Sequence, residues 1–142
     1  MVIQTVSGAV LYKSDKVKTV KDLVQEALNA GVDLSGANLA AADLQGIKVG
    51  SQATANFTEA NLSRAMLSVS DLPGANFTRA NLAQAAFFGA KLRKACFAGA
   101  NLRGAVLIKA DLSDADLSGA NLTDADLTNT VLNGANLDGV AK

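Results

Sequence analysis

Residues 55–69 read ANFTE-ANLSR-AMLSV, three consecutive copies of one five-residue unit. The unit continues without interruption, so that Leu or Phe stands at every fifth position from Phe57 to Leu137. Ala precedes each of these residues by two positions, except at Ser70 and Thr130. A period of five fits neither an α-helix nor an alternating strand. A short fixed period is instead typical of a solenoid, in which each unit buries its apolar side by stacking on its neighbours.

The repeat also predicts which side chains face inward. In an extended segment, residues two apart point to the same side, so the Ala and the Leu or Phe of each unit lie together in the interior. The residue between them faces outward. The two residues that follow form a corner, where Gly, Ser, Thr and Asp are frequent. The interior must be narrow, because every second inward residue is small.

A second period of twenty residues sets the number of sides. Phe57, Phe77 and Phe97 recur at this spacing. Twenty is four times five, so four short sides complete one turn, and residues twenty apart stack in columns at a strand-like spacing of about 4.8 Å. The sequence therefore predicts an all-β solenoid of about five turns, with the turns at residues 34–49, 57–72, 77–92, 97–112 and 117–132.

The same rhythm begins earlier, at Val32, and contains one irregular step. From Val49 to Phe57 the step is eight residues instead of five. We therefore expect a loop insertion at one corner, near residues 50–54. The chain is expected to form a single domain, with an N-terminal segment at 1–31 and a repetitive coil at 32–139.

The repeating units resemble a known family. ANLSR, ANFTR, ANLAQ, AKLRK, ANLRG, ADLSD and ADLSG are similar to the A(D/N)LXX units of pentapeptide repeat proteins. The resemblance covers residues 32–139. It implies the right-handed quadrilateral β-helix of that family, in agreement with the four-sided coil expected from the spacing.

Residues 1–31 are expected to cover the first turn of this coil. Their apolar residues lie at helical spacing and predict an amphipathic helix; they are Val20, Leu23, Val24, Ala27 and Leu28. Thr19 suits the N-cap position and Gly31 the C′ position of that helix. We therefore expect an α-helical cap over the open end of the coil, with a further strand within residues 6–13.

The other end of the coil carries no comparable segment in this sequence. The leucines of its last turn would lie at an open end, which favours association. We therefore expect a homodimer through the C-terminal end, formed by Leu122, Leu127, Leu132, Leu137 and Val140.

Few residues could support catalysis or bind a metal ion. The sequence has no His, which excludes imidazole acid–base chemistry and ligation. Cys96 is expected to be exposed, without the base that a nucleophile needs. Several late carboxylates, Asp111, Asp114, Asp116, Asp124 and Asp126, fall on different sides and corners of the coil. We therefore expect no enzyme activity, no cofactor and no metal site.

The composition excludes some partners. The 13 Lys and Arg balance the 13 Asp and Glu, so no net charge favours nucleic acid. No segment is apolar enough to span a membrane, and the first residues do not resemble a secretion signal. We expect a cytoplasmic protein whose partner is another protein rather than a membrane or nucleic acid.

The third side of the coil departs most from the repeat. Its outward positions carry apolar residues where most other sides carry Asn, Asp, Ser or Thr, and basic residues follow on the fourth side. A contiguous apolar patch on a rigid rod is typical of an interaction surface. The expected face comprises Met66, Val69, Ala86, Phe88, Val106, Ile108, Lys91, Arg93 and Lys94. By contrast, the column Asn61, Asn81, Asn101 and Asn121 predicts a ladder of stacked amides.

The function indicated by these features is that of a rigid scaffold for protein interaction, without enzyme activity. The family resemblance implies an alternative, because some of its members mimic duplex DNA, bind DNA gyrase or topoisomerase and confer quinolone resistance. The acidic residues of 111–142 favour this alternative. The zero net charge, the short rod and the basic residues of its middle part argue against it.

Overall fold

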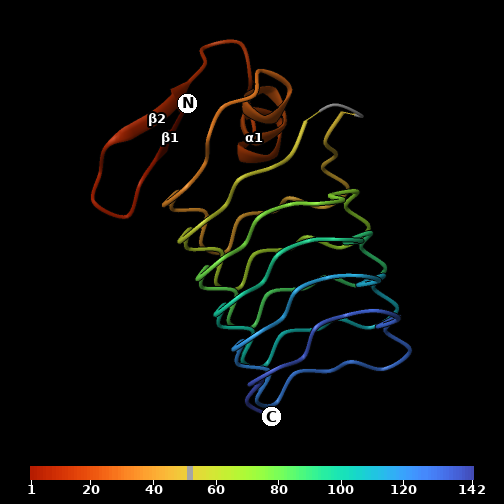
Figure 1. Ribbon diagram of the computed structural model, residues 1–142. Helices are drawn as coiled ribbons and strands as arrows, with labels where there is room; N and C mark the ends of the chain where they lie inside the picture. The colour runs from red at the N-terminus through yellow and green to blue at the C-terminus, as the bar shows by residue number, and fades with distance from the viewer. Residues whose placement is uncertain (51–52) are drawn as a thin grey trace.

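The computed structural model describes residues 1–50 and 53–142. The strands β1 (Val2–Gln4) and β2 (Val10–Lys13) form an antiparallel hairpin, and the helix α1 (Val20–Asn29) follows. The rest of the chain winds into a stack of similar turns, with the N-terminal elements at one end and the C-terminus at the other (Figure 1).

The turns stack in parallel and in register. Asn56 pairs with Asn76, and the pairing continues at steps of twenty residues along the coil. In the first turn the step is 23, as between Lys48 and Asp71. The three extra residues therefore lie between Lys48 and Asn56, in a segment whose residues 51–52 are outside the described part of the chain.

Each corner is a tight turn closed by one backbone hydrogen bond. At the corner after Phe57, for example, the N–H of Ala60 donates to the carbonyl oxygen of Phe57 at 3.0 Å, and Glu59 has a φ of +57°. A positive φ at the third residue is the geometry of a type II turn. Val69 has a φ of +51° and is the one β-branched residue in this conformation within the described residues. Such a residue is strained there, because its branched side chain crowds the backbone.

The interior is a narrow column of aromatic and aliphatic side chains. The ring of Phe77 is stacked between those of Phe57 and Phe97, at centroid distances of 5.3 and 4.9 Å, and Phe87 meets Phe77 edge-on at 6.0 Å. These rings are fully buried. Stacked and edge-on pairs add to the free energy gained from burial, so this column contributes to the stability of the coil beyond the area that its rings bury.

The two exceptions to the inward alanine differ in hydrogen bonding. The hydroxyl of Thr130 donates to the carbonyl oxygen of Leu107 at 2.8 Å. The hydroxyl of Ser70 is fully buried and has no partner among the described residues. Only Ser70 therefore carries the cost of an unsatisfied buried polar group.

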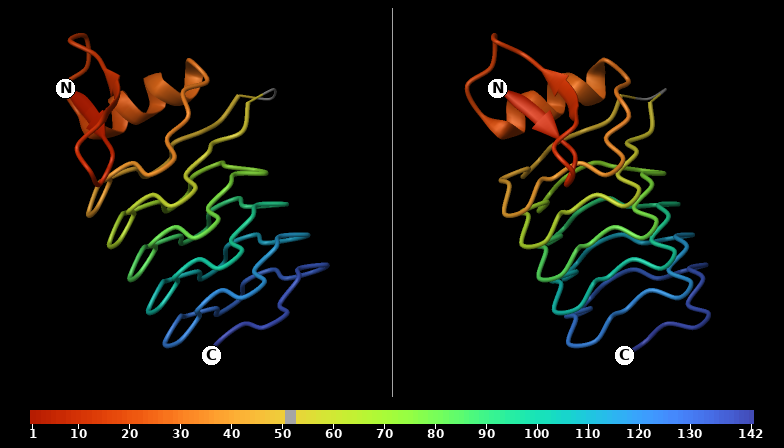
Figure 2. Two further views of the ribbon diagram at one scale, coloured as in Figure 1. Left: turned by 60° about the vertical axis from the view of Figure 1, so that its left-hand side comes forward. Right: turned by 90° about the vertical axis from the view of Figure 1, so that its left-hand side faces the viewer.

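The helix α1 lies across the first turn of the coil, as the two views of Figure 2 show. Thr19 accepts a hydrogen bond from the N–H of Asp22, and Gly31 and Val32 donate back to the last turn of α1 in a Schellman motif. The amide of Gln25 makes two hydrogen bonds to the backbone of Lys48, which ties α1 to the first turn.

β2 lies within residues 6–13, where the sequence predicts a strand, but it pairs with β1 in a hairpin. The strand that joins the coil is β1, whose extension pairs Thr5 with Ala37, and β2 forms the outer strand. Residues 6–8 belong to the turn between the strands instead. The other difference from an all-β expectation is that the sides of the coil are isolated bridges, because only two or three extended residues separate successive corners.

Each of the four sides of the coil carries one column of outward side chains. The first side carries Asn56, Asn76, Cys96, Asp116 and Asn136. The second carries Asn61, Asn81, Asn101 and Asn121, the third carries Met66, Ala86, Val106 and Asp126, and the fourth carries Asp71, Lys91, Asp111 and Val131.

Candidate interaction face

The outward Asn and Asp residues have a structural task. Most of them accept, at the side-chain oxygen, a hydrogen bond from the backbone N–H two residues later, as Asn76 does from Thr78 at 2.9 Å and Asp116 from Ser118 at 2.9 Å. This is an Asx turn, which satisfies an N–H that no neighbouring turn can reach. The preference for Asn or Asp at the outward position therefore follows from backbone hydrogen bonding.

The second side carries the amide ladder expected from the sequence. The side-chain amide of Asn81 donates to Asn61 at 3.4 Å, and that of Asn101 donates to Asn81 at 3.3 Å. The same oxygens accept from the corner N–H groups of Ser63 and Ala83. The outward polar groups of this side are thus satisfied within the coil.

The third side lacks these acceptors over three successive turns. Met66, Ala86 and Val106 have no side-chain oxygen, so the N–H groups of the residues two positions later have no acceptor among the described residues; these donors belong to Ser68, Phe88 and Ile108. Asp43 and Asp126 restore the Asx turn on the turns before and after. Three adjacent open donors therefore form a row with defined ends.

Elsewhere in the described coil, open donors of this kind stand alone. They follow Asn38, Lys91, Cys96 and Val131, and their stacked neighbours are either capped or, at Pro73, lack an N–H group. The row on the third side is thus a local property and not a general feature of the repeat.

The side chains around this row are apolar and accessible. Met66 is 39% exposed, Phe88 44% and the strained Val69 58%, whereas Ala86, Val106 and Ile108 are half-buried. The ammonium group of Lys109 lies 5.8 Å from the centre of the Phe88 ring, within the range of a cation–π contact. The N-terminal hairpin pairs at Gly36, Ala37 and Asn38, at the corner between the first and second sides of the first turn, and leaves Met66, Val69 and Phe88 exposed.

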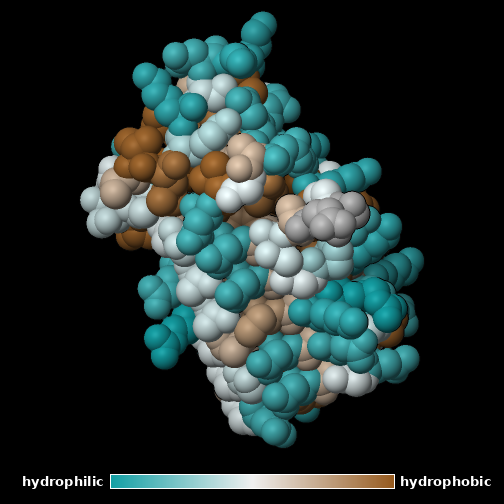
Figure 3. All heavy atoms as spheres, turned by 45° about the horizontal axis from the view of Figure 1, so that its top comes forward, coloured by the Kyte–Doolittle hydropathy of each residue, from teal (hydrophilic) through white to brown (hydrophobic). Residues whose placement is uncertain are grey.

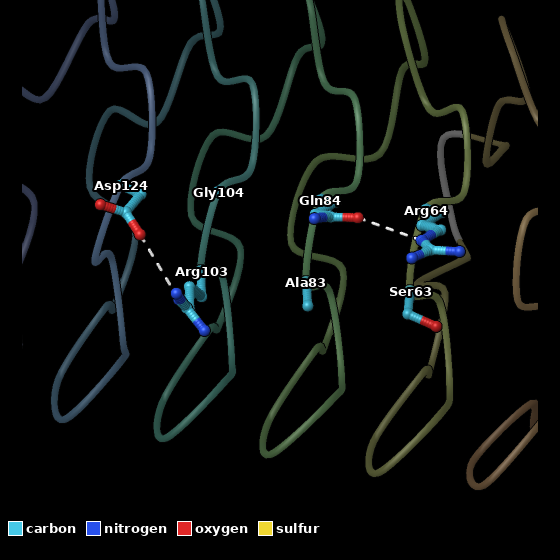
Figure 4. Close-up of a pocket in the computed structure, with 7 residues that line it drawn as sticks. All are labelled: Ser63, Arg64, Ala83, Gln84, Arg103, Gly104 and Asp124. Carbon is cyan, nitrogen blue, oxygen red and sulfur yellow. Dashed lines mark hydrogen bonds and ion pairs between the residues drawn. The ribbon is translucent and has the colours of Figure 1, made fainter.

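A shallow groove of about 510 Å³ runs along the corner between the second and third sides. In Figure 4 its side chains form a row across successive turns. The guanidinium of Arg64 donates to Gln84 at 3.0 Å, and Arg103 lies 3.4 Å from the carboxylate of Asp124. The remaining lining residues are Ser63, Ala83 and Gly104. Arg64 has no carboxylate within 4 Å among the described residues.

The basic residues expected beside the face lie on the fourth side, in two different states. Lys91 pairs with Asp71 at 3.1 Å, and Arg93 lies 3.5 Å from Asp111. Lys94 is exposed and has no carboxylate within 4 Å in the described part of the chain. The paired residues are also exposed, so their ion pairs are weak and their charges still contribute to the local potential.

The residues expected at the C-terminal end are buried to different degrees. Leu122 is buried, and Leu127, Leu132 and Val140 are half-buried. Leu137 is 38% exposed. The apolar surface at this end is thus smaller than the five residues together would provide.

The late carboxylates act as turn caps. Hydrogen bonds from the hydroxyl and N–H of Ser113, together with Arg93, lower the pKa of Asp111. The N–H and hydroxyl of Ser118 lower the pKa of Asp116 in the same way. In each case the hydrogen bonds stabilise the ionised form of the carboxyl group.

Other chemistry has little support. Cys96 is half-buried and not exposed as expected, because its sulfur lies 3.2 Å from the hydroxyl of Thr78 on the preceding turn. Within residues 1–50 and 53–142, no three His, Cys, Asp or Glu side chains gather as a metal site would require. No helix in this part of the chain is long and apolar enough to cross a membrane.

The sequence did not reveal two surface features. One is the row of open donors, whose signal was the missing Asn or Asp at three outward positions spaced by twenty. The other is the N-terminal hairpin, where Val2, Val6 and Val10 are exposed. Apolar surface gathers at this end of the molecule in Figure 3, while most of the coil is hydrophilic in that view.

Comparisons with known proteins agree with the repeat. The profile of pentapeptide repeats matches in eight copies, over residues 55–93, 85–124 and 120–140. No curated protein matches the chain in sequence.

Two cyanobacterial crystal structures are similar to it. Rfr23, a pentapeptide repeat protein from Cyanothece 51142, is 33% identical with a TM-score of 0.63, and the match covers 68% of this chain and 65% of Rfr23. HetL from Nostoc sp. strain PCC 7120, a pentapeptide repeat protein involved in the regulation of heterocyst differentiation, is 33% identical with a TM-score of 0.58. That match covers 75% of this chain and 53% of HetL, so the chain spans less than two thirds of either protein. The similarity implies that the coil is a right-handed quadrilateral β-helix.

Proposed function

The chain belongs to the pentapeptide repeat family, and from this premise we propose that it is a non-enzymatic scaffold that binds a protein partner through the third side of its coil. The observation that carries this proposal is the combination of exposed apolar side chains and open backbone donors on three successive turns. Around it we propose that α1 caps about five turns of a rigid coil, so that the face is held in a fixed shape.

The conformation of Val69 supports an interaction role for this side. A β-branched residue with positive φ costs stability, and Gly occupies the equivalent corner on the next turn, at Gly89. Strained residues concentrate at binding sites, where the surroundings hold them in place. The strain at this exposed valine therefore favours a role in binding.

Site-specific photocrosslinking in a lysate of the source organism tests this proposal. Phe88 is replaced by a photoreactive phenylalanine analogue, and the matched control carries the analogue at Ala98, the same corner position on the first side. We expect one crosslinked partner at position 88 only, competed by excess wild-type protein but not by the Met66→Asn/Phe88→Ser variant. Equal crosslinking at both positions, or competition by that variant, would contradict the proposal.

A second candidate function is mimicry of duplex DNA toward a topoisomerase. It is favoured by the acidic residues of the last turns, which include Asp114 and Asp138 in addition to the turn-capping carboxylates. Arg93 and Arg103 pair with two of these acidic residues and weaken the negative surface. A gyrase supercoiling assay decides the question: inhibition at micromolar protein would favour mimicry, and unchanged supercoiling would exclude it.

Two expectations from the sequence stay predictions. Homodimerisation at the C-terminal end predicts that Leu137→Ser, which changes an exposed side chain, shifts a dimer to a monomer in sedimentation velocity. A cytoplasmic location predicts that the protein appears in the cytosolic fraction of its source cell.

A further inference from the structure

We propose that the third side recognises a short acidic segment of its protein partner, whose carboxylates occupy the row of open N–H donors while an apolar side chain packs on Phe88. This inference rests on the proposed function and adds the chemistry of the partner.

The row of open donors lies between two corners that are capped by aspartates. On the turns before and after the row, the carboxylates of Asp43 and Asp126 accept from the corner N–H groups of Gln45 and Thr128 at 3.1 and 2.9 Å. The corners between them present the same N–H groups without an acceptor. A carboxylate supplied by a partner can therefore make the contact that Asp makes on the adjacent turns, and a hydrogen bond to a charged acceptor is the stronger kind.

The positive charges beside the row favour an acidic ligand. Two cations flank the row and have no carboxylate within 4 Å among the described residues: Arg64, in the groove at the corner between the second and third sides, and Lys109, beside Phe88. Complementary charge steers association and selects the partner. Asp43 and Asp126 oppose an acidic ligand at the two ends of the row, which restricts binding to the three open turns.

The length of the row limits the length of the peptide that can occupy it. Three stacked turns span about 10 Å, and an extended peptide advances about 3.3 Å per residue. A segment of only a few residues therefore covers the row. An extended peptide points alternate residues to the same side, so carboxylates can face the donors on both sides of one apolar residue that packs on Phe88.

The test uses three fluorescein-labelled synthetic peptides of about eight residues, in which one leucine lies between two polar residues placed two positions before and two positions after it, so that all three face the same side of an extended chain. The polar residues are Glu in the first, Gln in the second and Lys in the third. We expect the Glu peptide to bind the full-length protein about tenfold more tightly than the Gln peptide in fluorescence anisotropy at low salt. The Lys peptide is expected to bind most weakly.

Three variants locate the site. Phe88→Ser removes the apolar contact and is expected to weaken the Glu peptide about tenfold. Arg64→Glu combined with Lys109→Glu is expected to reverse the preference in favour of the Lys peptide. Ser68→Pro removes one N–H donor of the row. The corner should accept Pro, because Pro73 occupies the equivalent position on the fourth side. This variant should bind the Glu peptide about three- to tenfold more weakly. The matched control, Ala98→Pro, removes an equally open donor on the first side and should leave binding unchanged.

Several results would overturn the inference. These are equal binding of the Glu and Lys peptides, no binding of any peptide at about 1 mM, or tighter binding of a single-stranded oligonucleotide than of the Glu peptide. Self-association of the protein that Phe88→Ser abolishes would assign the face to a second copy instead. If the crosslink at position 88 forms while the peptides show no charge preference, the scaffold function stands and the acidic partner is excluded.

Discussion

The second and third sides share one backbone and differ in a single outward column. On the second side, asparagines cap their own corners and bond to one another from turn to turn. On the third side, Met66, Ala86 and Val106 leave the same corners open, yet the turns pair in the same register. The coil therefore does not need the outward caps in order to form. Whatever replaces Asn or Asp on an outward position can serve a purpose other than folding.

The largest expected change in the free energy of unfolding distinguishes the buried interior from the third side. Phe77→Ala removes a ring stacked between two others and should lower the free energy of unfolding by about 3–5 kcal/mol. Phe88→Ala, the matched exposed change on the third side, should cost less than about 1 kcal/mol. Urea denaturation followed by circular dichroism measures both. Similar losses would mean that the third side contributes to folding, and the comparison between the sides would fail.

A substitution at the strained corner of the third side should raise the free energy of unfolding instead of lowering it. Val69→Gly relieves a β-branched residue at φ +51°, and we expect about 1 kcal/mol of stabilisation after the entropic cost of Gly. The same denaturation experiment measures it. A matched change where the φ is already tolerated, Asn129→Gly on the same column, should have little effect. A destabilised Val69→Gly would show that the valine packs productively in the free protein.

Exchanging caps between the sides tests the comparison directly. Asn81→Ala opens a corner and breaks the amide ladder on the second side, and should cost about 0.5–1 kcal/mol. Ala86→Asn closes the middle donor of the third side and should stabilise by about 0.5 kcal/mol. Thermal unfolding of both variants and of the wild type shows whether each substitution raises or lowers the stability. Identical signs would indicate that the caps are not transferable between sides.

The smallest effect is expected in acid. The pKa values of Asp111, Asp116 and Asp126 are lowered in the folded protein by hydrogen bonds from the residues they cap. A lowered pKa contributes stability above the ordinary value of about 3.9 and loses it as the pH falls through the folded value. The melting temperature should therefore stay constant from pH 7 to about pH 5 and fall below about pH 4.

The matched control keeps the turns and removes the charges. A variant with Asn at all three positions retains the capping oxygens, as the native asparagines of the second side do. Its melting temperature should fall less steeply in acid. An equal fall in both proteins would assign the acid sensitivity to other carboxylates.

Much of the coil could be predicted because each unit carries its own structural information. The apolar positions determine the interior, and Ala and Leu at fixed spacing need only the next turn to complete their contacts. The ends of α1 could also be predicted from neighbouring residues, because Thr19 caps its first turn and Gly31 ends it in a Schellman motif. The amide ladder followed from the same twenty-residue spacing.

The remaining features depend on contacts that the spacing does not report. β1 is only three residues long, and its place beside the first turn depends on the pairing of Thr5 with Ala37. Cys96 is shielded by Thr78, a residue of another turn. The open donors of the third side depend on which acceptors each corner N–H group can reach in the folded coil.

Tyr12 gives the protein two separate spectroscopic signals. The chain has one tyrosine and no tryptophan, and the Tyr12 hydroxyl donates to Glu26 of α1 at 3.0 Å, which raises the pKa of Tyr12. Its fluorescence and its ultraviolet titration therefore report on the contact between hairpin and helix. The buried phenylalanine rings contribute to near-ultraviolet dichroism from the coil. Detachment of the N-terminal segment can thus be followed separately from unwinding of the rod, without introducing a label.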